Sequence, residues 1–134
     1  MNLKKFIIAV LATGVVGTIY DLVVNGFLLG GPVYSKHMSL FRQDSSMLWL
    51  TVANFVGALV FVWFYTKVKG SFSEGWKGGA TYGLYAGILI NFPTWIFAHL
   101  LFNNFSYIVA WAIILSGIGW GIIAGAVAGA LYKN

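Results

Sequence analysis

Five polar side chains stand within otherwise apolar stretches of the sequence: Asp21, Asn25, Asn54, Asn91 and His99. Asp21 and Asn25 are four residues apart and would share one face of a helix. A carboxylate among amides can be held by hydrogen bonds, can relay a proton or bind a cation, or can pair with another subunit. The elements that carry these residues decide which of these roles is available.

Motifs for catalysis and metal binding are weak in this sequence. There is no Cys, and the two His residues are His37 and His99. A bis-His haem would need both at the same depth, whereas His37 falls in a predicted loop. Ser35, His37 and Asp44 supply the residue types of a Ser-His-Asp triad, but no nucleophile elbow surrounds them. We therefore expect no enzyme activity, no cofactor and no metal.

The composition is that of an integral membrane protein. The chain has 134 residues, of which 60% are hydrophobic and 8% charged, against about 25% charged in soluble domains. Four apolar runs are each long enough to cross a bilayer as a helix. They cover approximately residues 6–28, 47–66, 77–102 and 107–132. We predict an all-α, four-helix up-down bundle that forms a single transmembrane domain over residues 1–134.

Residues 32–44, between the first two runs, have a different character. Pro32 is well placed at a first helical position, and Val33, Tyr34, Met38 and Phe41 then fall near one face, with Lys36, Arg42 and Gln43 away from it. This pattern favours a short helix on the membrane surface. An irregular loop is the alternative.

Two signals bear on the third helix. Ser71 and Glu74 have the spacing of a capping box, which predicts Ser71 as the N-cap. Pro93 lies inside the same helix and is expected to kink it.

The basic residues predict the orientation. With the N-terminus inside, the cytoplasmic side carries Lys4, Lys5, Lys67, Lys69, Lys77 and Lys133, and the outer side carries Lys36 and Arg42. This asymmetry favours both termini in the cytoplasm. The net charge of +5 is therefore a membrane-orientation signal and does not predict binding of nucleic acid.

Regularly spaced glycines predict how the helices pack. Lipid tails are as apolar as leucine, so close backbone contact and polar contacts must hold helices together in a bilayer. The third run carries Gly79, Gly83 and Gly87, and the fourth carries Gly117, Gly121, Gly125 and Gly129, all four apart. We expect these two rows to mediate close packing, and the fourth-run row can pack within one chain or between chains. In one arrangement the third-run row uses one groove and leaves Gly119 and Gly125 for another partner.

The polar residues fall at a similar depth. At ~1.5 Å per residue, Asp21, Asn54 and Asn91 lie ~8–12 Å below the outer boundary, and Asn25 and His99 lie nearer to it. The simplest interpretation is that Asn54 and Asn91, or a Trp indole, hydrogen-bond Asp21. A proton or cation relay and contact with another subunit are the alternatives.

Several segments resemble a group of small bacterial inner-membrane proteins with four predicted spans. The similarity is carried by residues 20–34 (Tyr-Asp-Leu-Val-Val-Asn-Gly-Phe-Leu-Leu-Gly-Gly-Pro-Val-Tyr), by residues 65–67, 73–75 and 82–87, and by the ending over 124–133. The resemblance implies location in the bacterial inner membrane but no activity. Members of the group carry His where this chain has Asn25, so a relay based on paired titratable groups is weakened here.

For function, we expect an accessory or scaffolding subunit that contacts membrane lipids and other membrane proteins, or itself. The motivation is the absence of catalytic motifs together with the extent of glycine surface. The alternative is an oligomeric transporter or channel for a small solute, cation or proton that uses Asp21.

Overall fold

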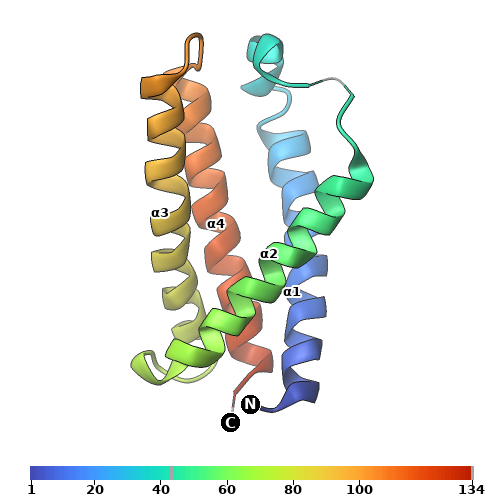
Figure 1. Ribbon diagram of the computed structural model, residues 1–134, viewed down its shortest axis with the longest axis vertical. Helices are drawn as coiled ribbons and strands as arrows, with labels where there is room; N and C mark the ends of the chain where they lie inside the picture. The colour runs from blue at the N-terminus through green and yellow to red at the C-terminus, as the bar shows by residue number, and fades with distance from the viewer. Residues whose placement is uncertain (43, 134) are drawn as a thin grey trace.

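The computed structural model describes residues 1–42 and 44–133, and every regular element in them is helical. The four long helices are α1 (Leu3–Val23), α2 (Met47–Val68), α3 (Trp76–Leu101) and α4 (Tyr107–Leu131). They alternate in direction along the chain (Figure 1). With their short extensions they have mean hydropathies of 1.5 to 2.2 and are long and apolar enough to span a membrane. The prediction of an all-helical chain with four such helices is confirmed.

The helices begin where the sequence offers a cap. The Asn2 side chain accepts a hydrogen bond from the Lys5 N–H at the start of α1. Ser46 does the same for the Trp49 N–H at the start of α2. In both cases the side-chain oxygen satisfies a donor that has no partner within the helix.

The α3 helix lies close to the predicted residues 77–102, but the predicted N-cap, Ser71, was wrong. Ser71 ends a short 3₁₀ turn, η3 (Lys69–Ser71), and α3 begins only after Gly75. Gly75 has φ +87°, a conformation that glycine adopts without the Cβ penalty of other residues. This turn separates Ser71 from the helix, so the capping-box spacing falls in a loop. Further along, α3 continues through Pro93 to Leu101.

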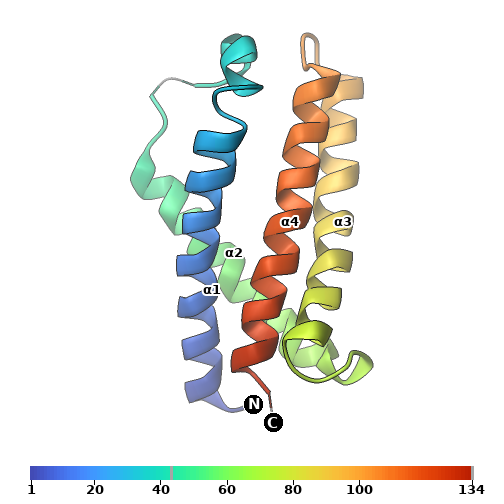
Figure 2. The same cartoon turned by 180° about the vertical axis from the view of Figure 1, so that it is seen from behind.

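Both termini lie at one end of the molecule, here called the terminal end, as Figures 1 and 2 show. The Asn2 N–H donates to the Tyr132 hydroxyl (3.1 Å), and the Lys5 ammonium donates to the Lys133 carbonyl (2.8 Å). The opposite end, here called the far end, carries the connection between α1 and α2.

The connection at the far end contains two short helices. A π-helical turn, η1 (Val24–Leu28), continues α1, and a 3₁₀ helix, η2 (Tyr34–Leu40), follows. His37 departs from helical dihedral angles within η2. The surface segment predicted over 32–44 includes Gln43, which lies outside the described residues.

The helices α3 and α4 pack with their backbones in contact. Cβ atoms added at Gly79 and Gly83 would collide with the carbonyl oxygens of Gly125 and Gly121. A Cβ at Gly87 would lie 2.9 Å from the Ile118 Cα. This contact leaves no space for side chains along the seam, and it pairs the two glycine rows within one chain.

Gly119 and Gly125, which one of the predicted arrangements leaves for another partner, both pack within this chain. Gly125 packs against Gly79, and the space beside Gly119 is taken by the Tyr20 hydroxyl of α1. The space beside Gly117 is taken by the Asn91 side chain.

The helix α2 crosses obliquely and packs differently at its two ends (Figure 1). Near the terminal end it joins α1, α3 and α4 in a core of buried side chains: Phe6, Ala9, Phe61, Val62, Tyr65, Tyr82, Ala124, Ala128 and Tyr132. Toward the far end α2 leans onto α1 and diverges from α3.

We predict that Gly83→Ala lowers the free energy of unfolding in detergent by ~1–3 kcal/mol, because the added methyl group must push α3 and α4 apart. Gly57→Ala is the matched control, since a Cβ there meets nothing within 4 Å. That variant should be unchanged or up to ~1 kcal/mol more stable, as expected for Gly→Ala in a helix. Equal stability of the two variants would contradict the packing described above.

Candidate functional site

Asp21 lies at the centre of a hydrogen-bonded group of side chains in the half of the bundle nearer the far end. Its Oδ2 accepts a hydrogen bond from Asn54 Nδ2 of α2 (2.9 Å), and its Oδ1 accepts one from Asn25 Nδ2 of η1 (3.2 Å). Asp21 donates to none of the described residues. Both carboxylate oxygens are thus held by amide N–H groups from two different elements.

Asn25 extends this group to α4 and to the far-end connection. Its Oδ1 accepts from the hydroxyls of Tyr34 and Ser116, each at 2.9 Å. The Tyr20 hydroxyl donates in turn to the Ser116 carbonyl (2.7 Å). Burial raises the pKa of Tyr34 to about 12, with smaller contributions from Tyr20 and Asp21, so this hydroxyl stays a donor at neutral pH. We call these residues (Tyr20, Asp21, Asn25, Tyr34, Asn54 and Ser116) the Asp21 network.

Three members of the Asp21 network were missed by the sequence reasoning. Ser116 carries a weak signal, since it interrupts an apolar run, and Tyr20 directly precedes Asp21. The position of Tyr34 depends on the π-helical turn and on the fold of the connection after it. No residue spacing indicates that geometry.

Two predicted members of the polar layer do not bond to Asp21. Asn91 Nδ2 donates to the Gly87 carbonyl of its own helix (2.9 Å), so the predicted hydrogen bond from Asn91 to Asp21 was wrong. His99 Nδ1 lies 2.7 Å from the Phe105 carbonyl, at the turn between α3 and α4. His99 therefore belongs to that turn, whereas Asn91 faces the same cavity as Asp21.

A cavity of about 950 Å³ lies beside the network, between α2, α3 and α4. The carboxylate and the amides of its lining lie toward the far end, with Ser116: Asp21, Asn25, Asn54 and Asn91. Ser71, Tyr82 and Tyr85 line it toward the terminal end. The other walls are largely apolar. Val60 and Phe64 of α2 and Leu89 and Ile90 of α3 line it and are 47–74% exposed, which places an opening between these two helices.

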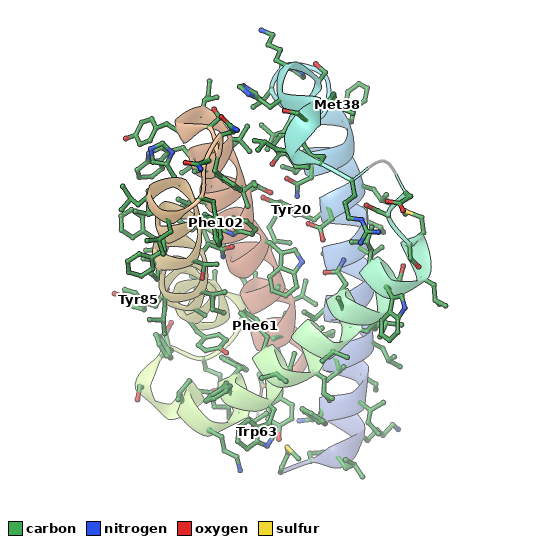
Figure 3. The ribbon with its side chains drawn as sticks, turned by 45° about the horizontal axis from the view of Figure 1, so that its top comes forward. Tyr20, Met38, Phe61, Trp63, Tyr85 and Phe102 are labelled. Atoms are coloured by element: carbon green, nitrogen blue, oxygen red, sulfur yellow. The ribbon has the colours of Figure 1, made fainter. Side chains whose placement is uncertain are left out.

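Aromatic rings line the cavity on the terminal side of Asp21. Phe61 contacts Trp120 edge-on with ring centroids 5.4 Å apart, and it contacts Tyr82 at 4.9 Å. Figure 3 shows Phe61 on α2 and Tyr20 between α1 and α4. Trp120 packs on Gly17, one helical turn from Asp21, and its Nε1 is buried with no hydrogen-bond partner among the described residues. Trp120 also lines the cavity.

The negative charge of Asp21 has no cationic partner. Among the described residues, no Lys, Arg or His side chain pairs with it. Nor do the described residues contain a group of three His, Cys, Asp or Glu side chains that could hold a metal. The arrangement is suited to binding, with one unbalanced carboxylate at the polar end of an apolar cavity.

No protein-family model matches the sequence, and no curated protein or solved structure matches it. The geometry of the site is therefore what supports a function.

We predict that Asn54→Leu lowers the free energy of unfolding in detergent by ~1–2 kcal/mol, because it removes the hydrogen bond between α2 and the Asp21 carboxylate. Thr51→Val is the control on the same helix, since its exposed hydroxyl bonds only to the Met47 carbonyl. That change should stay within ~0.5 kcal/mol. If both variants unfold alike, the bond from Asn54 to Asp21 does not hold α2 in place.

Proposed function

We propose that this chain is an integral membrane protein that binds an amphiphilic molecule, taken up sideways from the bilayer. The observation that carries the proposal is the cavity of about 950 Å³, with apolar walls and a carboxylate at one end.

Membrane insertion is supported by the surfaces of the four helices. Large apolar side chains are exposed along all of them, such as Leu11 (54%), Leu89 (74%) and Leu115 (62%). In water this surface would far exceed the apolar patches of soluble monomers. We propose the bacterial inner membrane as the location, on the resemblance of the sequence to proteins of that membrane.

The charge distribution supports an orientation with both termini in the cytoplasm. The six basic residues expected inside lie in or beside segments at the terminal end, whereas Lys36 and Arg42 belong to the far end. Under the positive-inside rule, the terminal end faces the cytoplasm. The far end and the Asp21 network then lie in the outer half of the bilayer.

The shape of the cavity supports an amphiphilic ligand. Small-molecule sites have volumes of about 300–1,000 Å³ and combine apolar walls with a few polar groups. The opening between α2 and α3 is bordered by Phe64 and Leu89, which would face lipid in this orientation. A ligand that enters there must be soluble in the bilayer and carry a polar group for Asp21 and Asn54.

The structure weakens one of the grounds for predicting an accessory-subunit function. That prediction rested on the absence of catalytic motifs and on the extent of glycine surface, and the second ground is weaker because Gly119 and Gly125 face Tyr20 and Gly79 of the same chain. That function stays a prediction, tested by the native mass of the purified protein and by what co-purifies with it.

A transporter or channel that uses Asp21 is the second candidate function. Its support is the position of Asp21, which lines a cavity that opens between α2 and α3. Binding at this carboxylate would also be the first step of such transport. If Asp21→Asn leaves the flux in proteoliposomes unchanged, a transport function that uses Asp21 is ruled out.

The orientation predicts which positions react from outside the cell. Met38→Cys, on η2, should react with a membrane-impermeant maleimide on intact cells, and Lys77→Cys, near the start of α3, should react only after lysis. The wild-type chain has no Cys and serves as the unlabelled control. The reverse pattern would place the termini outside.

The proposed function predicts where a neutral amphiphile binds. A dodecanol with a photoreactive diazirine in its chain should label the cavity-facing residues of α2 and α3, located by peptide mass spectrometry. Gly57→Leu should reduce this labelling several-fold, because Gly57 lines the cavity and a Cβ there meets nothing within 4 Å, so the leucine side chain can fill part of the space.

Gly70→Leu is the matched control for this experiment. Gly70 is equally unobstructed but lies in η3, outside the cavity lining. Labelling that spreads evenly over the lipid-facing helix surfaces, or that Gly57→Leu leaves unchanged, would contradict a binding site in the cavity.

A further inference from the structure

We infer that the cavity selects a single-chain amphiphile with a protonated primary amine as its head group, and that the amine pairs with the Asp21 carboxylate. This inference rests on the proposed function and specifies its ligand class.

The first argument is charge balance. Both Asp21 oxygens accept amide N–H groups, and no basic side chain among the described residues neutralises the carboxylate. A charge left unpaired at membrane depth is costly, and such residues usually pair with an opposite charge. A cationic head group supplies the missing charge, whereas an anionic one would be repelled.

The second argument is the hydrogen-bonding capacity that remains at the polar end. Asn54 donates from Nδ2 to Asp21, and Asn91 donates from Nδ2 to the Gly87 carbonyl. Asn54 leaves its Oδ1 without a donor among the described residues and lines the cavity, whereas the Asn91 Oδ1 packs against Gly117 of α4. The Asp21 carboxylate and the Asn54 Oδ1 are therefore the acceptors beside the cavity, and an ammonium group carries three N–H donors and no acceptor.

The third argument is the shape of the space next to the carboxylate. Trp120 lines the cavity one helical turn from Asp21, and Phe61 and Tyr82 continue the aromatic wall. Such rings attract cations and accommodate hydrocarbon. From Asn91 to Tyr82 the cavity follows α3 for ~14 Å, which suits one extended chain.

The direction of the cavity along α3 agrees with the orientation of an amphiphile in the outer leaflet. Asp21 and Asn91 lie toward the far end, and Tyr82 and Phe72 line the cavity near the terminal end. A bound amphiphile therefore points its head outward and its chain inward, as it does in the outer leaflet. It can enter between α2 and α3 without turning over.

Competition against the photoreactive dodecanol tests the head-group preference. Dodecylamine, dodecanol and dodecanoate share one chain length and differ in head group. In wild type, we expect dodecylamine to displace the label at a concentration at least about tenfold lower than dodecanol, which corresponds to ~1.4 kcal/mol, and dodecanoate to be the weakest competitor. In Asp21→Asn the difference between amine and alcohol should disappear.

The ratio of the two competitors, compared between wild type and Asp21→Asn, cancels their different partition into detergent. Asp21→Glu keeps the charge and should keep the preference for the amine, which separates loss of charge from loss of folding. Cavity labelling with no amine preference, or a preference that persists in Asp21→Asn, would overturn this inference and leave the proposed function intact. Absence of cavity labelling would instead overturn the proposed function.

Solvent extraction of the purified protein identifies the source of the amine. An amine-bearing single-chain lipid in solvent extracts of wild type, missing from Asp21→Asn, assigns the ligand to the lipids of the cell. Extracts without such a lipid, combined with the amine preference, assign it to amphiphilic amines that enter the membrane from solution.

Discussion

The close approach of α3 and α4 is the constraint on which the rest of the structure depends. Inside a bilayer, two helices gain little from burying apolar side chains against each other, so their association relies on backbone proximity and polar contacts. Gly79, Gly83 and Gly87 provide that proximity against Gly121 and Gly125. The result is a narrow two-helix unit whose backbones are in contact from Gly79 to Gly87.

The other two helices cannot pack in the same way, and the cavity is a consequence. On the face of α4 toward α1, the large side chains Tyr20 and Trp120 occupy the spaces beside Gly119 and Gly17. Because of these bulky contacts, α1 lies farther from α4 than α3 does. The oblique α2 closes the bundle only near the terminal end, through Phe61 and Tyr82. Toward the far end the space stays open.

The sequence was informative about helices and about the spacing of glycines, because both depend on local periodicity. Long apolar runs and residues four apart on a helix can be recognised without knowing the fold. The prediction of Ser71 as the N-cap was wrong because α3 begins after Gly75, which has a positive φ. The spacing of a capping box carries no information about that backbone conformation.

The candidate site was predictable only in part, for a related reason. Depth along each helix brought Asp21, Asn54 and Asn91 to one level, but depth does not give the rotation of a helix about its axis. That rotation, together with a local bond to Gly87, turns Asn91 Nδ2 away from Asp21. The π-helical turn likewise brings Asn25 into contact with Tyr34 and Ser116, which no spacing rule anticipates.

The Asp21 network also links ligand binding to stability. Two amides and two hydroxyls orient the carboxylate and hold α1, α2, α4 and the far-end connection together. They supply hydrogen bonds but no positive charge, so part of the cost of a carboxylate at this depth remains. A ligand that binds only the folded chain stabilises it in proportion to RT ln(1 + [L]/Kd). An amine bound at Asp21 would act on the same group that joins the helices, so occupancy of the cavity and tightness of the outer half of the bundle should rise together.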